Sequence, residues 1–190
     1  MPVILDLCSG LGGASEAFTQ EEWTVIRIEN NPELEYVPHT RILDVLEWVD
    51  WIEDLPRCDV IWASPPCTDF STADWRKDWD DFEPDMSIVQ ACLDIIDFLK
   101  PRVWVLENVR GACRFFEPLI GWHQQRIGPF FLWGQFPRIT MPYGFKHSKM
   151  DVRDPQLRAV IPFEISSEFL RVLEQQWTLR RWFTWVSEPF

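Results

Sequence analysis

The sequence predicts an α/β fold, with one domain over residues 1–190 in which a mostly parallel sheet carries helices on both faces. Short, almost wholly apolar runs alternate with segments whose apolar residues recur at helical spacing, a pattern typical of βαβ units. Turn residues and isolated acids follow these runs, where parallel strands would end. Ligands of such sheets bind outside the carboxyl ends of the strands, so the same pattern also predicts a binding site.

Five elements are expected in the first part of the chain. The run VILDL is apolar throughout except for its acid, and WTVIRIE is rich in β-branched residues, so both favour strands. Helices are favoured where apolar residues recur every three or four positions, as in VLEWVDWIEDL. The expected elements are a strand at 3–7, a helix at 14–22, a strand at 23–29, a helix at 45–55 and a strand at 58–64.

The remainder of the chain repeats this alternation. DMSIVQACLDIIDFL has helical spacing, whereas RVWVLEN and PFFLWG are short apolar runs typical of buried strands. The expected elements are a helix at 85–99, a strand at 102–108, a helix at 115–127, a strand at 129–134 and an amphipathic helix at 162–176. Residues 179–190 fit either an edge strand or an apolar patch used for self-association.

The composition excludes several classes of protein. With 46% apolar residues, 12 Trp and 14 Phe, the chain is far more apolar than a disordered segment. It has no run of 18 apolar residues and no secretory signal pattern at its N-terminus, so we expect a cytoplasmic protein with no membrane partner. Its five cysteines form no Cys-x-x-Cys pair and no zinc-finger spacing with histidine, so we expect free thiols and no metal site.

Charge is distributed unevenly along the chain. The net charge of −12 disfavours a general nucleic-acid-binding surface, because phosphate contacts supply most non-specific affinity. Residues 98–160 are the exception, with 10 basic and 4 acidic residues. A polyanion could bind to that stretch alone. The composition is equally compatible with basic residues that are solvated and bind no partner.

The turn after the first predicted strand points to an adenosine ligand. Gly10, Gly12 and Gly13 let the backbone approach a ligand closely. Glu29 ends the next predicted strand, where a carboxylate can accept hydrogen bonds from both ribose hydroxyls. The turn has no basic residue, so the ligand should lack phosphates, and S-adenosylmethionine fits that description. The alternative is a structural turn beside an exposed acid.

Cys67 is a candidate nucleophile in a loop that Pro65 and Pro66 restrict. A free thiol is only a few per cent ionised at neutral pH, so a catalytic cysteine needs a local partner. Glu107 ends the neighbouring predicted strand, and the protonated form of a half-buried carboxyl group there could donate to a ring nitrogen. Together the two groups suit activation of C5 in a pyrimidine. The alternative is a small buried thiol.

Three motifs, in this order and at this separation, resemble the cytosine-C5 DNA methyltransferase family: DLCSGLGG (6–13), SPPCTDFS (64–71) and LENVRG (106–111). The resemblance covers about residues 1–111, and RAVIPFEIS (158–166) is similar to the family's closing cofactor motif. It implies a Rossmann-like fold of the S-adenosylmethionine-dependent methyltransferases, with S-adenosylmethionine as cofactor and DNA as partner.

The resemblance also implies roles for single residues. Cys67 would attack C6 of cytosine while Glu107 contacts N3 and the amino group, and Arg126 is what survives of the family's arginine motif. Glu29 would bind the ribose hydroxyls and Asp44 the adenine amino group, while the 6–13 turn holds the methionine portion. The implied cofactor-binding residues are Asp6, Leu7, Cys8, Gly10, Leu11, Gly12, Gly13, Glu29, Asn30, Asp44, Val45 and Pro66.

This chain departs from the family pattern in four places, one of which is the reduced arginine motif at Arg126. Cys8 stands where relatives often have Phe, and Asn30 stands where a ring often stacks on adenine, so cofactor affinity should be modest. Residues 134–158 are a short substitute for a large target-recognition region, and a closing cofactor-side helix follows at 159–176. We therefore predict weak, salt-sensitive DNA binding with little sequence preference. The basic residues of this short stretch are Arg138, Lys146, Lys149, Arg153 and Arg158.

Four interpretations follow. The first is a DNA cytosine-C5 methyltransferase that lacks specificity or obtains it from a protein partner. The second is the same chemistry on single-stranded DNA or a free cytosine nucleotide, which avoids the cost of base flipping. The third is a catalytically silent binding module, against which intact Cys67, Glu107 and Glu29 argue. The fourth, an exocyclic-amine methyltransferase, ranks last because such enzymes carry an aromatic residue in place of Cys67.

Overall fold

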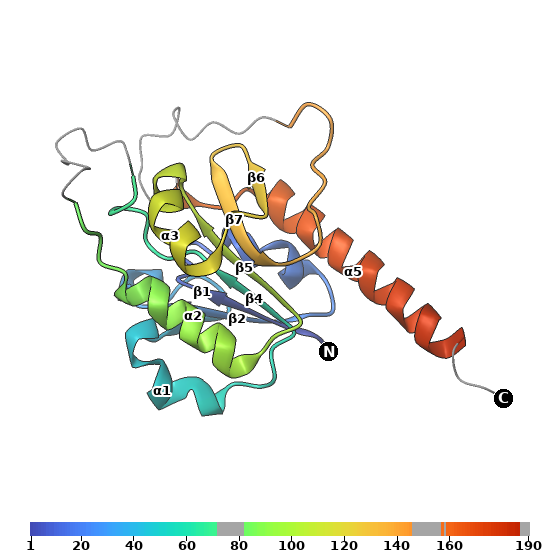
Figure 1. The fold of residues 1–190 in the computed structure, drawn as a ribbon. Helices are drawn as coiled ribbons and strands as arrows, with labels where there is room; N and C mark the ends of the chain where they lie inside the picture. The colour runs from blue at the N-terminus through green and yellow to red at the C-terminus, as the bar shows by residue number, and fades with distance from the viewer. Residues whose placement is uncertain (72–81, 146–156, 158, 187–190) are drawn as a thin grey trace.

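The computed structural model describes residues 1–71, 82–145, 157 and 159–186, with side chains described up to residue 178. Within these residues one seven-stranded sheet runs through the molecule in the order β3-β2-β1-β4-β5-β7-β6 (Figure 1). The first five strands in this order are parallel, whereas β7 runs antiparallel to both β5 and β6. The predicted mostly parallel sheet is confirmed.

The elements have the following bounds. The strands are β1 (Val3–Leu7), β2 (Thr24–Glu29), β3 (Thr40–Ile42), β4 (Val60–Ala63), β5 (Val103–Asn108), β6 (Gln125–Ile127) and β7 (Phe130–Gln135). The α-helices are α1 (Trp48–Trp51), α2 (Ser87–Leu99), α3 (Cys113–Ile120) and α5 (Phe163–Val186). The 3-10 turns are η1 (Gly13–Ser15), η2 (Ala17–Gln20), η3 (Pro32–Leu34), η4 (Val45–Glu47), η5 (Ile52–Asp54) and η6 (Arg110–Ala112).

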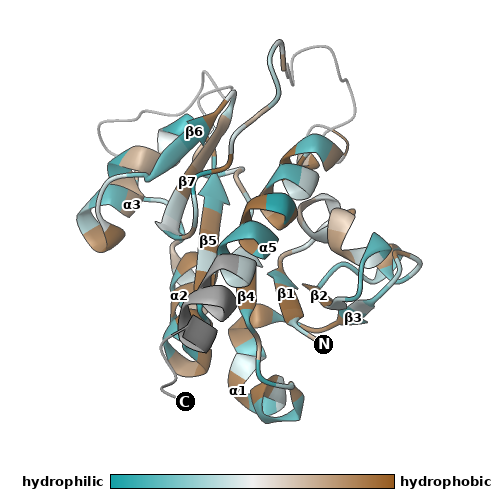
Figure 2. Cartoon of the chain, turned by 90° about the vertical axis from the view of Figure 1, so that its right-hand side faces the viewer, coloured by the Kyte–Doolittle hydropathy of each residue, from teal (hydrophilic) through white to brown (hydrophobic). Residues whose placement is uncertain are grey.

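Helices cover both faces of the sheet, and each face has its own apolar core. Alternate residues of β1 point to opposite faces of the sheet. Leu5 packs in the core under α2 and α3, while Ile4 packs in the core under α5. Figure 2 shows α5 lying across the face formed by β1, β4 and β5. Both faces being buried explains why the strands are mostly apolar and do not alternate with polar residues, with Asp6 of β1 and Arg27 of β2 as buried exceptions.

The register of the parallel strands brings their carboxyl ends to one edge. Leu7 pairs with Ile28 of β2 on one side and with Ala63 of β4 on the other. Ala63 also pairs with Leu106 of β5. The residues that follow these positions therefore meet at the same edge, where the strand order reverses direction between β1 and β4.

The predicted helix at 115–127 is wrong in its second half. Helix α3 ends at Ile120, and Gly121 follows with a φ of 81°. A positive φ is readily available to glycine, which has no Cβ, and at this position it turns the chain out of the helix. The chain then forms strand β6 at Gln125–Ile127, in a hairpin with β7.

Other predicted elements differ in kind or extent. The stretch at 14–22 forms the two 3-10 turns η1 and η2, and the stretch at 45–55 is divided among η4, α1 and η5. The closing helix α5 begins at Phe163 and continues to Val186, so an edge strand at 179–190 is wrong. In the described part of the chain, no helix combines the length and the apolar character needed to cross a membrane.

Candidate active site

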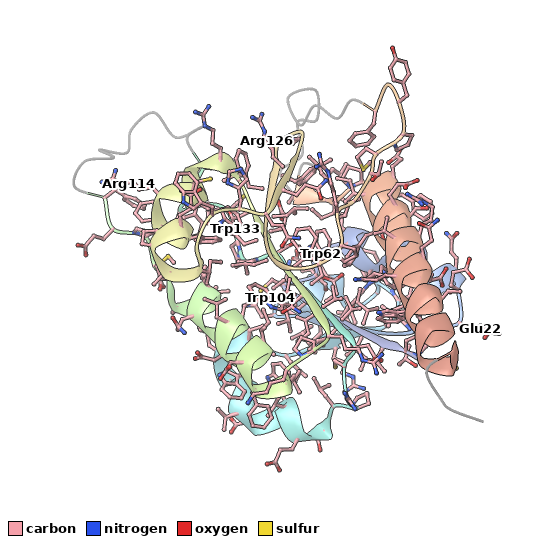
Figure 3. All side chains as sticks on the ribbon, turned by 45° about the vertical axis from the view of Figure 1, so that its right-hand side comes forward. Glu22, Trp62, Trp104, Arg114, Arg126 and Trp133 are labelled. Carbon is pink, nitrogen blue, oxygen red and sulfur yellow. The ribbon has the colours of Figure 1, made fainter. Side chains whose placement is uncertain are left out.

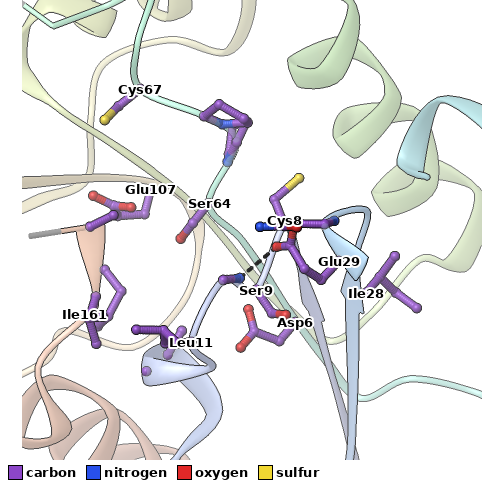
Figure 4. A pocket seen from close by; sticks show the side chains of 18 of the residues that line it. Asp6, Cys8, Ser9, Leu11, Ile28, Glu29, Ser64, Cys67, Glu107 and Ile161 are labelled. Carbon is purple, nitrogen blue, oxygen red and sulfur yellow. Dashed lines mark hydrogen bonds between the residues drawn. The ribbon is translucent and has the colours of Figure 1, made fainter. Parts of the chain in front are cut away.

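A cavity of about 640 Å³ lies at the carboxyl ends of β1, β2, β4 and β5 (Figure 4). Its size is in the range of pockets that hold a small molecule or cofactor. The predicted site residues that line it are Asp6, Cys8, Gly10, Leu11, Gly13, Glu29, Asn30, Val45, Pro66, Cys67 and Glu107. The structure thus places the predicted nucleophile and most of the predicted cofactor residues around one cavity.

A buried arginine forms hydrogen bonds that hold the glycine turn at residues 10–13. Arg27 of β2 is fully buried, and its guanidinium donates to Ser15 Oγ at 2.8 Å and to the Gly12 carbonyl at 3.0 Å. It also forms an ion pair with Glu16 at 2.9 Å. Gly12 has a φ of 75°, and a Cβ on it would overlap the Arg27 guanidinium. Arg27 therefore fixes the conformation of the turn and requires glycine at position 12.

Glu29 is held in place by two backbone groups. The Gly10 N–H donates to Oε2 at 2.8 Å, and the Asn31 N–H donates to Oε1 at 3.0 Å. A carboxylate has about four lone-pair positions, so two bonds leave each oxygen able to accept one more. Glu29 can therefore bind a pair of hydroxyl groups in the cavity without losing its own orientation.

Asp6 places an unsatisfied acceptor at the cavity. Its Oδ2 accepts a hydrogen bond from Ser15 Oγ at 2.6 Å, whereas its buried Oδ1 has no partner among the described residues. Burial raises the pKa of Asp6 from 3.8 to about 7, against the opposing effects of the Ser15 hydrogen bond and the Arg27 charge. A buried acceptor without a partner is costly, so this position suits a donor group supplied by a ligand.

The loop that carries Cys67 is anchored to the end of β5. Asn108 is buried, and its Nδ2 donates to the Pro65 carbonyl at 2.9 Å. The Phe70 N–H donates to the Cys67 carbonyl at 3.1 Å. Cys67 is partly exposed, whereas Glu107 is buried, with 6% of its surface accessible. Figure 4 shows both side chains on the same side of the cavity, across from Glu29 and Asp6.

The segment before α5 completes the cavity. Ala159, Val160 and Ile161 line it, and Gly13 lies so close that a Cβ there would overlap the Ile161 carbonyl. Ser166 ties α5 to the glycine turn, since its Oγ donates to the Ala14 carbonyl at 2.7 Å and accepts from the Ala17 N–H at 3.0 Å. The resemblance of residues 158–166 to a closing cofactor motif is consistent with this placement.

The electrostatic character of the cavity restricts its ligand. Three carboxyl groups, those of Asp6, Glu29 and Glu107, line it, and its described lining contains no Lys or Arg. Such a lining disfavours phosphates and favours a ligand with positive charge. Apolar side chains supply most of the remaining surface, as adenine requires.

Four predicted residues are not part of the cavity lining. Leu7 is buried in the core, Gly12 faces Arg27, and Asp44 caps η4 by accepting from the Leu46 N–H at 2.9 Å. Arg126 is exposed on β6 and donates to the Gly128 carbonyl at 2.8 Å.

Arg126 borders a separate depression that also includes Arg138, and it projects outward at the edge of the molecule (Figure 3). The structure does not bring this arginine into the cavity with Cys67, so its role stays a prediction. Lys146, Lys149, Arg153 and Arg158 of the predicted DNA-binding stretch lie outside the described residues.

Sequence reasoning missed the groups that support the site. Arg27 interrupts an otherwise apolar run, and a charge in a buried strand indicates a hydrogen-bonded network. Asn108 directly follows Glu107 at the end of a predicted strand, and a polar side chain in that position indicates a contact at the site. The contribution of residues 159–161 had no local signal beyond the family resemblance.

The sheet order and the cavity at the carboxyl ends of its strands define a Rossmann-like α/β fold. A similar solved structure is that of the Entamoeba histolytica methyltransferase EhMeth, with a TM-score of 0.54 and 16% sequence identity. The match covers 78% of this chain and 58% of that chain. At this identity the likeness shows the fold alone.

Comparison of the sequence with known families then identifies the family. The model of the C-5 cytosine-specific DNA methylase family matches residues 3–115. The chain is 33% identical over 119 residues to the "Probable DNA (cytosine-5)-methyltransferase" of Frog virus 3 (isolate Goorha), covering 55% of this chain and 52% of that protein. It is 32% identical over 115 residues to the "Type II methyltransferase M.Bsp6I" of Bacillus sp. (strain RFL6), covering 57% of this chain and 36% of that protein.

The chain belongs to the C-5 cytosine-specific DNA methylase family. It spans about half, or less, of the length of these curated relatives.

Proposed function

We propose that the chain is an S-adenosylmethionine-dependent methyltransferase that modifies C5 of cytosine in DNA through a covalent Cys67 adduct, with residues 1–190 acting as one catalytic domain. The observation that carries the proposal is one cavity lined by Cys67 and Glu107 on one side and by Asp6 and Glu29 on the other (Figure 4). Membership of the family supports the same assignment.

The residues of the cavity fit the cofactor. S-adenosylmethionine supplies a methyl group on a positively charged sulfur when it is bound. The oriented Glu29 carboxylate would accept from the two ribose hydroxyls, and the unsatisfied Asp6 Oδ1 would accept from the amino group of the methionine portion. The described lining has carboxyl groups but no basic residue, which suits a cationic adenosine without phosphates.

Cys67 and Glu107 would perform the chemistry on the base. The Cys67 thiolate forms a bond from Sγ to C6 of cytosine, while protonated Glu107 donates to N3, so that the electron pair of the C5–C6 bond becomes available at C5. C5 would use that pair to bond the methyl carbon, whose bond to the cofactor sulfur would break and leave its electron pair on that sulfur as a neutral thioether. N3 would return its proton to Glu107. Loss of the C5 proton to water would then restore the C5–C6 double bond as the S–C6 bond breaks and releases the Cys67 thiolate.

Methyl transfer and covalent trapping test this proposal. We expect the purified chain to transfer a radiolabelled methyl group to cytosine-containing DNA, and Cys67→Ser to abolish transfer because a hydroxyl is a far weaker nucleophile. DNA containing 5-fluorocytosine should form an adduct at Cys67, detectable by peptide mass spectrometry. The matched control is Cys58→Ser, since Cys58 is buried outside the cavity. Undiminished transfer by Cys67→Ser, or an adduct at another residue, contradicts the mechanism.

The same assay distinguishes the substrates. The net charge of −12 favours a substrate that needs few phosphate contacts, namely single-stranded DNA or a free cytosine nucleotide. Duplex DNA, single-stranded DNA and a deoxycytidine nucleotide are therefore offered in parallel. Activity on duplex DNA only after addition of cell extract would indicate a protein partner that supplies specificity. Cofactor binding without transfer to any of the three substrates would instead indicate a catalytically silent module.

A further inference from the structure

Three different metal-ligand types meet beside α3, away from the cavity. Cys113 and Glu117 lie four residues apart on α3, so they share one face of the helix. The chain reverses at Gly121 and returns His123 to that face. The Sγ of Cys113, a carboxylate oxygen of Glu117 and a ring nitrogen of His123 all lie within 4.8 Å of one another.

The surroundings hold these ligands in place and leave one side open. His123 Nδ1 lies 3.3 Å from Glu117 Oε1, and the ring packs edge-on against Phe131 at a centroid distance of 5.0 Å. Trp133 also contacts the ring, at 6.1 Å. All three ligand residues are partly exposed, so an ion can enter from solvent and retain a water molecule.

The donor set suits zinc. Cysteine sulfur, histidine nitrogen and carboxylate oxygen are the three zinc ligands of proteins, and three protein ligands with one water complete a tetrahedral site. With metal–ligand bonds of about 2.0–2.3 Å, ligand atoms in such a site lie roughly 3.5 Å apart, so movements of about 1 Å would close this cluster around an ion. Calcium and magnesium are disfavoured because they prefer oxygen ligands throughout.

We propose that Cys113, Glu117 and His123 form a zinc site that joins α3 to the turn leading into β6. The position gives the site a structural consequence. Phe116 of α3 packs against Phe70 at 5.1 Å, and the Phe70 N–H is bonded to the Cys67 carbonyl. A metal ion that ties α3 to the following turn therefore stabilises the support of the Cys67 loop without touching the cavity.

Cobalt is the first probe, because its spectrum reports both geometry and ligand type. The whole purified chain is stripped with a chelator and titrated with Co²⁺. We expect one equivalent to give the visible bands of a tetrahedral ion and the near-ultraviolet charge-transfer band of a cobalt–thiolate bond. Zn²⁺ should displace the cobalt and abolish both. No thiolate band in the unmodified chain would overturn the proposal and leave the contact between Glu117 and His123 as a simple hydrogen bond.

Single substitutions identify the ligands. Cys113→Ser should remove the charge-transfer band, and Glu117→Gln and His123→Gln should each weaken Zn²⁺ binding at least tenfold. Cys58→Ser and His39→Asn are the matched controls, because both residues lie outside the cluster. An unchanged cobalt spectrum in Cys113→Ser would place the metal elsewhere and overturn the assignment. Circular dichroism verifies that each variant folds, and these side chains are exposed enough for substitution.

Thermal unfolding supplies a second readout that does not depend on methyl transfer. Zn²⁺ at about a hundredfold excess over its dissociation constant should raise the Tm of the unmodified chain by roughly 5–10 °C. His123→Gln should lose that increase, whereas His39→Asn should keep it. An equal increase in both variants would contradict the site. Neither outcome depends on whether the chain proves to be a methyltransferase.

Discussion

Asp6 is a carboxyl group buried at the end of β1, with one oxygen bonded to Ser15 and the other without a partner among the described residues. A charge in that position is poorly solvated, which is why its pKa rises to about 7. Burial of the Asp6 carboxyl group destabilises the empty fold, and a ligand that donates a hydrogen bond to Oδ1 would offset this loss. Asp6 then couples the stability of the fold to the occupancy of the cavity.

This coupling predicts a pH dependence. Between pH 3.8, its ordinary pKa, and about 7, its folded pKa, Asp6 binds more protons in the folded chain than in the unfolded chain. Its contribution to the free energy of unfolding therefore falls as the pH rises through this window, and it levels off above pH 7. Asp6→Asn should remove this decline, measured by urea unfolding at pH 5, 6, 7 and 8. The exposed Asp97→Asn variant is the control, and an unaltered decline in Asp6→Asn would disprove the account.

Glu29 gives a prediction about affinity. Glu29→Ala removes the carboxylate that the Gly10 and Asn31 amides orient, so cofactor binding should weaken by about 1.5–3 kcal/mol, or roughly 10- to 150-fold. Isothermal titration calorimetry with S-adenosylmethionine measures this loss. Glu33→Ala, an exposed acid four residues away, should bind normally. Unchanged affinity in Glu29→Ala would move the cofactor out of this cavity.

Among the elements, the glycine turn shows how one strand constrains the loop after another. Gly10 and Gly12 both have positive φ, but only Gly12 lies against the buried Arg27 of β2. Gly10→Ala should cost about 1–2 kcal/mol of stability, the strain of a left-handed residue. Gly12→Ala adds overlap with the guanidinium, so its loss should reach about 3 kcal/mol or more. Urea unfolding of the two variants compares them, and equal losses would mean that Arg27 moves aside without cost.

The elements also show which sequence signals suffice. Mostly apolar runs predicted β1, β2, β4, β5 and β7, because strands buried on both faces have few positions for polar residues. Strand β3 was missed because it has three residues, two of them exposed. The predicted helix at 115–127 ran past Ile120 because Ile127, seven residues further on, keeps a helical spacing. The chain leaves the helix at Gly121, through a backbone conformation that this spacing does not reveal.

The candidate site was easier to predict than the boundaries of its elements. The carboxyl ends of parallel strands lie at one edge of the sheet. Glu29, Cys67 and Glu107 were therefore expected together, because each lies at or just after the end of a predicted strand. Arg126 could not be placed in this way, because it lies on β6, which pairs antiparallel with β7 outside the parallel part of the sheet. The supporting contacts of Arg27 and Asn108 depend on side-chain packing, which no spacing in the sequence specifies.

For the molecule as a whole, we expect charge to govern any encounter with DNA. We expect a chain of net charge −12 to bind a polyanion only through its basic stretch at residues 98–160, where each phosphate contact would add about 0.7–0.9 to the slope of log affinity against log salt. Replacing Lys146, Lys149 and Arg153 by Ala should lower that slope by about 2–3 and reduce activity on DNA while sparing a nucleotide substrate. Fluorescence anisotropy across a salt series measures the slope.

The control for this prediction replaces basic residues outside residues 98–160. Arg41 and Arg57 are exposed, so Arg41→Ala with Arg57→Ala should leave the slope unchanged. Tight binding of the unmodified chain to one defined duplex site would contradict the predicted lack of sequence preference.

The two hydrogen bonds of Ser166 join positions 149 and 152 residues apart in sequence. During synthesis the glycine turn leaves the ribosome early, whereas the wall formed by residues 159–161 leaves late. Until α5 docks, the cavity of the nascent chain lacks the wall formed by residues 159–161. Docking must close a long loop, which is entropically costly. A ligand that contacts every wall of the cavity binds only chains in which α5 has docked. Such a ligand would protect those chains from proteolysis and would not protect chains that end before α5.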